Sequence, residues 1–340
     1  MNPSPLLGTL LGTAVGDSLG LPYEGLSRRR VTAFSEIRHR LLFGRGLFSD
    51  DTEHSLMLAS TLLGHHEEAS QFQRAFAWKL RWWLLGLPAG VGLGTAKAIL
   101  RLWMGFPASK AGVRSAGNGA AMRSAVVGVF FHHEPQKRRE FALAACRVTH
   151  RDPRAEESAV LVAEAAAMAA NSVPNVQVIG TLETHLESDE MRSRFATLKT
   201  DLAAARTVAE FADGIGCGNR VSGFAPDTVA VALYAWLRHR GNFESAVRSV
   251  IACGGDTDTV AAITGGICGA ETGEPGIPKA WIDGICDWPR SVAHLRCLAE
   301  AMETGAGSAP RIFWPFVLMR NALFLAVVLL HGFRRFLPPY

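Results

Sequence analysis

The stretch GGDTDTVAAITGGICGA, residues 254–270, opens with acidic and hydroxyl side chains and continues with small and apolar residues at helical spacing. The stretch FSDDTEHSLMLA, residues 48–59, follows the same design about two hundred residues earlier. Each stretch predicts a helix with a cluster of side-chain oxygens at its start. Ser, Thr and Asp are common N-caps, and acidic residues suit the positive end of a helix dipole, so capping is one explanation for the first cluster.

The second cluster favours metal binding instead. A cap uses one side chain, whereas this cluster offers four consecutive oxygen-bearing side chains behind Gly254 and Gly255, which allow a close approach to a ligand. Carboxylates gathered at two helix starts repel one another unless a positive charge lies between them, and Mg²⁺, Mn²⁺ and Ca²⁺ bind such oxygens. The two clusters are Ser49, Asp50, Asp51 and Thr52, and Asp256, Thr257, Asp258 and Thr259.

Composition and periodicity predict an all-α protein. The chain has 340 residues, 48% of them apolar, enough for a sizeable core in one large domain or two average ones. Apolar residues recur at spacings of three and four, and no hairpin signal is convincing. We expect residues 28–47 to be the least structured segment. Helices are expected at about residues 5–19, 51–64, 69–86, 93–104, 119–132, 137–148, 154–170, 201–213, 226–239, 243–252, 257–269, 290–304 and 312–332.

Charge and cysteine content narrow the functional classes. The net charge of +4 is too small to predict nucleic-acid binding by itself. Six arginines crowd residues 28–45, either as a solvated loop or as a patch for a diphosphate or an acidic partner. The six cysteines lack zinc-site spacing, and residues 1–11 lack the features of a secretory signal. We therefore expect a cytoplasmic protein without disulfides.

The C-terminal segment is a long apolar run. Residues 312–330 read IFWPFVLMRNALFLAVVLL, which is nearly long enough to span a membrane but is interrupted by Pro315, Arg320 and Asn321. We favour a helix packed on the protein body or on another subunit, followed by a helix lying on a membrane surface and then by a span. The expected division is a main domain over residues 1–306 and a hydrophobic helical tail over residues 307–340.

Six motifs in order resemble the ADP-ribosylglycohydrolase family, which includes the dinitrogenase-reductase-activating glycohydrolase and the ADP-ribosylarginine hydrolases. Each motif is weak alone, and the GGDTDT element is the most specific. The resemblance covers residues 6–270 and leaves the tail unexplained. The motifs are GTAVGDSLGLPYEG (12–25), SDDT (49–52), AGNGAAMRSA (116–125), THRDPRAEESA (149–159), SGFAPDTVAVAL (222–233) and GGDTDT (254–259).

The resemblance implies a compact orthogonal multi-helix bundle with a central cleft that holds two Mg²⁺ ions, for which Mn²⁺ could substitute. It assigns Ser49, Asp50 and Asp51 to one ion. It assigns Asp256, Asp258 and Thr259 to the pair, with Asp258 as the bridge. The family commonly has threonine where this chain has Ser49, and serine keeps the hydroxyl that binds a metal.

The first motif adds two further carboxylates. Glu24 follows Pro22 and Tyr23 in a loop, and the resemblance implies that it lies over the ribose as the general acid or base. Asp17 ends the first helix, where it either contacts substrate or bonds to a neighbouring helix end. Asp51 and Asp258 are the metal-ligand carboxylates that could move the proton in place of Glu24.

The remaining motifs imply the substrate contacts. The turn Gly117, Asn118 and Gly119 is expected to open a helix near Ala120 and bind the diphosphate, and Arg123 to pair with a carboxylate near the metals. Ser115 takes a position where some arginine-directed relatives carry aspartate and some serine-directed relatives carry serine.

Two further candidates have structural alternatives. His150 is expected to line the ligand cleft or to be a cap or a core residue. Phe224 is expected to stack beside the adenine or to be a buried residue at a helix entrance.

The resemblance implies a Mg²⁺-dependent hydrolase that removes ADP-ribose from a modified protein side chain, with arginine favoured as the acceptor. The partners are then an ADP-ribosylated protein and the product ADP-ribose. Alternatives are a hydrolase of serine-linked, small-molecule or nucleic-acid conjugates, and a non-catalytic ADP-ribose-binding module. All four metal-site aspartates are present, which argues against the last.

Overall fold

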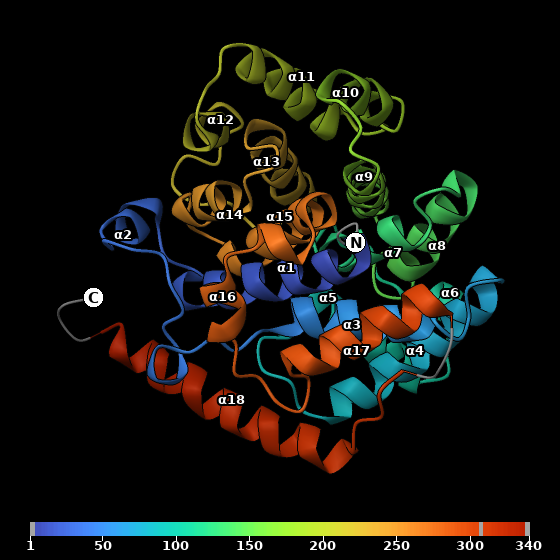
Figure 1. The fold of residues 1–340 in the computed structure, drawn as a ribbon. Coiled ribbons are helices and arrows are strands. Elements are labelled where there is room, and N and C mark those ends of the chain that lie inside the picture. The colour runs from blue at the N-terminus through green and yellow to red at the C-terminus, as the bar shows by residue number, and fades with distance from the viewer. Residues whose placement is uncertain (1–3, 306–308, 337–340) are drawn as a thin grey trace.

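The computed structural model describes residues 4–305 and 309–336. Within these two ranges the chain forms eighteen α-helices, joined by turns and short 3₁₀ segments, and contains no β-strand (Figure 1). The prediction of an all-α protein is therefore confirmed.

Two antiparallel helices, α1 (Pro5–Gly20) and α15 (Thr257–Thr272), run through the middle of the molecule (Figure 1). They touch along a row of glycines spaced four residues apart in α1. A Cβ atom added to Gly12 would lie 2.1 Å from the carbonyl oxygen of Gly265, so only glycine permits this backbone approach. The contact brings the acidic start of α15 beside the last turn of α1. The row consists of Gly8, Gly12, Gly16 and Gly20.

The other helices surround this pair, with α9 and α13 packed against α15 and α3 against α1. Their bounds are α2 (Arg28–Thr32), α3 (Asp50–Leu62), α4 (Ala69–Leu85), α5 (Leu93–Trp103), α6 (Ala108–Ala111), α7 (Ala125–Phe130), α8 (Pro135–Arg147), α9 (Pro153–Ala170), α10 (Asn175–Glu183), α11 (Asp189–Ala203), α12 (Val208–Gly214), α13 (Ala225–Arg238), α14 (Phe243–Ala252), α16 (Lys279–Gly284), α17 (Val292–Thr304) and α18 (Trp314–Arg334).

The bounds of two predicted helices were wrong. The helix expected at 201–213 is divided, because α11 ends at Ala203 and α12 begins at Val208, with Ala205 between them at a φ of 53°. The helix expected at 119–132 is a short 3₁₀ turn followed by α7. Helices α10 and α16, and most of α11, were not predicted, because their apolar faces are narrow and cover few core positions.

The arginine-rich segment 28–47 is mostly irregular, as expected, but it is held to the body. It contains α2 and a 3₁₀ turn at 42–44. The Tyr23 hydroxyl lies 3.2 Å from the amide nitrogen of Arg38, which donates to it. The ring of His39 is buried, and its Nε2 atom lies 3.0 Å from the carbonyl oxygen of Trp281.

The C-terminal helix α18 lies along one side of the body, which is the first of the three arrangements considered for the tail (Figure 1). Arg320 in its middle is buried and donates to the carboxylate of Asp287 at 2.5 and 3.1 Å and to the carbonyl oxygen of Phe48 at 2.5 Å. Asn321 donates to the carbonyl oxygen of Gly86 at 2.7 Å. The polar interruption in the apolar run is thus the point where the helix is fastened to the protein.

Candidate active site

The site begins with Asp17, at the end of α1. Its carboxylate accepts hydrogen bonds from the amide of Ser49 at 2.9 Å and from the amide and hydroxyl of Thr52 at 3.1 and 2.6 Å. Burial raises the pKa of Asp17 to about 6, although the bonds from Thr52 and Ser49 oppose the shift. Asp17 therefore fixes the N-terminus of α3 from beneath. It does not border the cavity described below, so of the two roles considered for Asp17 the structure favours the bond to a neighbouring helix end.

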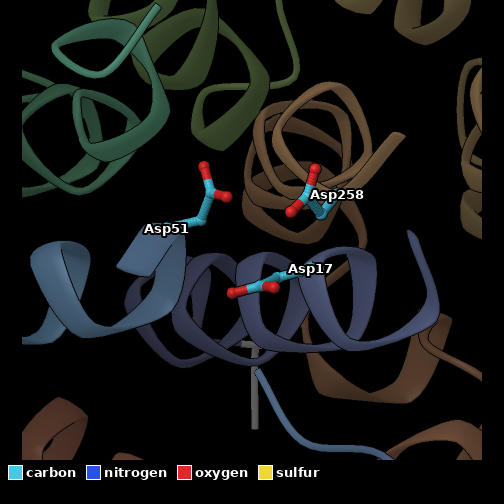
Figure 2. Close-up of side chains that lie close together, drawn as sticks. All are labelled: Asp17, Asp51 and Asp258. Atoms are coloured by element: carbon cyan, nitrogen blue, oxygen red, sulfur yellow. The ribbon is translucent and has the colours of Figure 1, made fainter. Parts of the chain in front are cut away.

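Asp51 and Asp258 face Asp17 across the gap between α3, α1 and α15 (Figure 2). One oxygen of each carboxylate lies within 4.8 Å of one oxygen of the other two. Asp51 Oδ2 accepts from the hydroxyls of Ser49 at 3.0 Å and Thr259 at 3.2 Å, while Asp51 Oδ1 is buried with no hydrogen-bond partner. An unpartnered carboxylate oxygen at the centre of an acidic cluster fits a cation.

Capping and metal binding are both supported at the first cluster. Ser49 is the N-cap of α3, and its hydroxyl accepts from the amide of Asp51 at 3.2 Å. Asp256 is the N-cap of α15 by position, but its side chain makes no capping hydrogen bond. The acidic side chains that do not cap remain available to a ligand.

Neighbouring carboxylates, and not cations, are the main charges that act on Asp50, Asp51 and Asp258. Burial raises the pKa of Asp51 well above its usual range, and the negative charges of Asp17 and Asp50 add to the effect. Burial also raises the pKa values of Asp50 and Asp258, again with neighbouring carboxylates as the next causes. The donor set of carboxylate and hydroxyl oxygens suits a hard cation, which would supply the missing positive charge.

A cavity with a volume of about 590 Å³ opens above this cluster. Acidic and hydroxyl residues form one part of its wall, and the glycine turn with its neighbours forms another. Asp51 lies deeper, with Asp17. The predicted residues that border the cavity are Glu24, Ser49, Asp50, Asp256, Asp258 and Thr259, and Ser115, Gly117, Asn118, Gly119 and His150.

Comparisons with known proteins agree with this arrangement. A family model described as ADP-ribosylglycohydrolase matches residues 4–310. The chain belongs to the ADP-ribosylglycohydrolase family. The family consists of hydrolases, so the chain is a hydrolase that acts on ADP-ribosyl linkages.

Individual relatives are similar over most of their length. The ADP-ribosyl-[dinitrogen reductase] glycohydrolase of Rhodospirillum rubrum is 26% identical over 288 residues, covering 82% of this chain and 89% of that protein. The ADP-ribosylarginine hydrolase Tri1 of Pseudomonas putida (strain GB-1) is 26% identical over 308 residues, covering 87% and 76%. A solved structure described as an ADP-ribosylglycohydrolase-related protein complex matches with a TM-score of 0.69 and 28% identity, covering 89% of this chain and 98% of that one.

In this member of the family the glycine turn is tied to the acidic cluster. The side-chain amide of Asn118 donates to Asp256 Oδ2 at 2.7 Å and to the hydroxyl of Thr228 at 3.0 Å. The turn was expected to open an α-helix near Ala120, and this prediction was wrong. A 3₁₀ segment follows the turn, and α7 begins only at Ala125. A binding site at the end of a helix dipole is therefore not formed here, and the turn contributes its own backbone and Asn118.

Arg123 also differs from its prediction. It is fully buried and donates to the carbonyl oxygens of Gly119 at 2.6 Å and Ala145 at 3.0 Å, and to the hydroxyl of Thr149 at 2.6 Å. It pairs with none of the site's carboxylates. Its role is to hold the end of the glycine turn against α8.

His150 borders the cavity behind the glycine turn. Its Nδ1 atom lies 2.8 Å from the hydroxyl of Thr149. Burial and the nearby charge of Arg123 lower the pKa of His150 to about 3, so the ring is neutral. A neutral imidazole can donate or accept one hydrogen bond at the cavity wall without adding charge.

Phe224 does not border the cavity, so the expected stacking position is not found there. It occupies the N-cap of α13, half-buried, with the guanidinium groups of Arg154 and Arg194 at 5.4 and 5.6 Å from its ring. The alternative reading, an aromatic residue at a helix entrance, is the one that the structure supports.

Glu24 lies at the cavity rim. Partial desolvation raises its pKa, the negative charge of Asp256 adds to this, and the positive charge of Arg335 opposes it. The Arg335 guanidinium donates to the carbonyl oxygens of Glu24 at 2.8 Å and Pro22 at 2.5 Å. The C-terminal helix therefore holds the backbone of the loop that carries Glu24.

Several wall residues were not predicted from the sequence. Arg220 brings a positive charge to the cavity. Phe324 and Val328 come from α18, and residues 89–95, the end of a loop and the first turn of α5, form another part of the wall. The tail gave no functional signal because the family motifs do not extend to it. Its contribution depends on a long-range contact that spacing along the chain does not reveal.

Proposed function

We propose that this protein hydrolyses the N-glycosidic bond between ADP-ribose and an arginine side chain of a modified protein, with two Mg²⁺ ions in its acidic cluster. The observation that carries the proposal is the buried group of Asp17, Asp51 and Asp258 at the base of a cavity about 590 Å³ in volume. Neighbouring acids are the main charges around Asp51 and Asp258, and the cavity is within the size range of small-molecule sites.

The residues of the two clusters fit the ions. Ser49, Asp50 and Asp51 would hold one ion, and Asp256, Asp258 and Thr259 would complete the pair, with Mn²⁺ as a substitute. When bound, the ions would supply positive charge that fixes the ribose hydroxyls and polarises an oxygen or a water. The unpartnered oxygen of Asp51 supports this assignment.

Glu24 is the proposed general acid or base. Its raised pKa keeps more of it protonated near neutral pH than an exposed glutamate would be, which suits proton transfer to a leaving group. Its position at the rim leaves it able to reach a substrate above the acidic cluster. Asp51 and Asp258 take part by holding the ions and orienting the ribose.

The other wall residues are assigned to binding. Ser115 and the turn 117–119 would contact the ADP-ribose moiety, and His150 would offer one neutral hydrogen bond. Arg220 would provide the positive charge that a diphosphate requires. These assignments need no residue that lies away from the cavity.

Arginine is favoured as the acceptor for an electrostatic reason. When ionised, the six carboxylates in and below the cavity carry six negative charges against the five positive charges of two divalent ions and Arg220, and this surplus of one negative charge favours a cationic guanidinium. A relative named as an ADP-ribosylarginine hydrolase is consistent with this choice. Ser115 keeps serine as the acceptor to be compared.

The test is release of free ADP-ribose from two peptides, one modified on arginine and one on serine, with and without Mg²⁺. We expect Mg²⁺-dependent release from the arginine peptide. Release from the serine peptide alone would keep the hydrolase and replace the acceptor. Release that is insensitive to Mg²⁺ and to chelation would overturn the metal assignment, and release from neither peptide would overturn the protein substrate.

A further inference from the structure

The outward face of α18 is apolar and uncovered. The inward side chains of Val317, Arg320, Asn321 and Phe324 are buried against the body. Between these positions, and beyond them toward both ends of the helix, large apolar side chains point away from the protein, with exposures from 40% to 69%. The exposed set on this helix and the residue before it is Phe313, Phe316, Met319, Leu323, Leu325, Leu329, Leu330 and Phe333.

Aromatic residues extend this face onto α4. The indole N–H of Trp314 donates to the carbonyl oxygen of Trp82 at 3.3 Å, and the two rings lie 6.0 Å apart. Trp82 in turn contacts Trp78 at 6.1 Å, and both are exposed. The ring of Trp288 lies 4.7 Å from Phe316. We call this combined surface of α18, Trp78, Trp82 and Trp288 the aromatic face.

The charge of the aromatic face is one-sided. The sequence has no Asp or Glu from residue 69 to 133 or from 304 to 340, the two segments that carry nearly all of this surface, and both contain Lys or Arg. At the C-terminal end of α18 a hollow is lined by Arg38, Arg40 and Arg334, with Glu36 as its acidic member. Phe43, 97% exposed, borders the same hollow.

We infer that the aromatic face docks on the surface of an anionic lipid bilayer. Exposed Trp, Phe and Leu side chains with flanking cations that outnumber the acids match a helix that lies in the interface of a negatively charged membrane. A second copy of the chain fits less well, because pairing two such faces would bring cations against cations.

The helix lies on the membrane rather than across it. By length and composition α18 could cross a bilayer, and it is the one helix in the described ranges that could. Crossing would remove Arg320 from Asp287, leaving a buried carboxylate without its cation and placing a charge at mid-membrane. Docking by the outward face leaves this ion pair intact.

Docking would bring the active-site cavity close to the lipid surface. Phe324 and Val328 of α18 line the cavity, and Leu93, 78% exposed at the start of α5, also borders it. The helix that meets the membrane is thus also a wall of the site. A modified protein bound at the same membrane would be presented to the cavity without diffusing through solution.

The test is flotation of the full-length protein with vesicles of phosphatidylcholine alone or with 30% phosphatidylglycerol. We expect binding to the anionic vesicles that weakens as salt is raised. The double variant Met319→Glu/Leu323→Glu should reduce binding by at least about tenfold, because two exposed apolar side chains become charged. Val176→Glu is the matched control, since Val176 is 85% exposed on α10, far from α18 (Figure 1).

Circular dichroism and size-exclusion light scattering of each variant accompany the flotation. Leu330→Gln, at another exposed position, is the second variant should the double variant unfold. No flotation of the wild-type protein would overturn the inference. So would equal loss in the Val176 control, or a wild-type dimer that the α18 variants dissociate, which would assign the face to a second copy. None of these outcomes depends on hydrolase activity.

Discussion

The first turn of α3 carries three carboxylates, Asp50, Asp51 and Glu53, which differ in the charges that surround them. Asp50 and Asp51 face other acids, and burial followed by those neighbours raises their pKa values. Glu53 is as buried as Asp51, but its carboxylate lies 2.6 Å from Arg290 and accepts from the Trp83 indole at 2.6 Å. Burial alone would raise the pKa of Glu53, but Arg290 and then Arg320 outweigh it, so the pKa is lowered.

The comparison separates a structural cluster from a site. A buried acid with its own cation contributes to the folded state and offers nothing to a ligand. A buried acid without one keeps an unfavourable charge that an external cation can relieve. Asp50 and Asp51 are three and two residues from Glu53, so the contrast is made by their partners and not by their place in the sequence.

The largest expected effect is on turnover. It concerns the uncompensated cluster, by which we mean Asp17, Asp50, Asp51 and Asp258. Asp258→Asn removes one of the carboxylates proposed to hold the ions, and we expect ADP-ribose release to fall by about 10³-fold or more. The far-ultraviolet circular dichroism should not change, because Asp258 neutralises no cation of the fold. Full activity in this variant would remove the acidic cluster from the mechanism.

The next effect is on the stability of the fold. It concerns the compensated cluster, which is Glu53 with Arg290 and Arg320. Glu53→Gln leaves Arg290 buried without its carboxylate, and we expect a loss of about 3 kcal/mol in the free energy of unfolding. Urea denaturation in the presence of chelator measures it. Glu300→Gln, at an exposed position of α17, is the control. A loss below about 0.5 kcal/mol at Glu53 would contradict the comparison.

Metal binding should stabilise only through the uncompensated cluster. At a Mg²⁺ concentration 100-fold above the dissociation constant, we expect the free energy of unfolding to rise by about 2.7 kcal/mol. The rise should vanish in Asp258→Asn and persist in Glu53→Gln. Thermal unfolding with and without Mg²⁺ measures both, and an equal response in the two variants would show that the ions bind elsewhere.

The smallest effect is the pH dependence of the metal-free protein. Asp17, with a folded pKa of about 6, and the other raised carboxylates bind more protons in the folded state than in the unfolded chain. The contribution of Asp17 to stability is therefore lost as pH rises from about 4 through 6, on the order of 1–3 kcal/mol, and the contributions of the other three carboxylates are lost in the same direction. Glu53, whose pKa is lowered, acts in the opposite sense at lower pH.

Urea denaturation between pH 4 and 7.5 in chelator would show this fall in stability. Saturating Mg²⁺ should reverse it, because the ions bind the ionised carboxylates. A metal-free protein that becomes more stable over this pH range would mean that the carboxylates are neutralised from within the fold.

The sequence predicts the part of the site that is local. The helix starts at Asp50 and Thr257, the two acidic clusters and the all-α class all follow from spacing over a few turns. Short-range patterns do not reveal which buried acid has a cation, because Arg290 and Arg320 reach Glu53 from more than two hundred residues away.

The same limit explains why two candidates kept two possible roles. For Asp17 the sequence left substrate contact and a bond to a helix end open, and only the packing of α1 against α3 favours the second. For Phe224 it left adenine stacking and a helix entrance open, and only the fold shows the ring beside Arg154 and Arg194 at the start of α13. The row of glycines in α1 could have been read from its four-residue period, since such a row predicts close helix packing.

That row of glycines also bears on the size of the ion that we propose for the acidic cluster. Asp17 lies on α1 and Asp258 on α15, and Gly16 leaves no room for a methyl group, whose carbon would lie 2.0 Å from the carbonyl oxygen of Ala261. The distance between the backbones of α1 and α15 is thus held near its minimum. A short distance favours the short metal–oxygen bonds of the proposed Mg²⁺ over the longer ones of Ca²⁺. We expect Gly16→Ala to increase the distance between α1 and α15 and to shift the metal preference of the site toward Ca²⁺ in a competition titration.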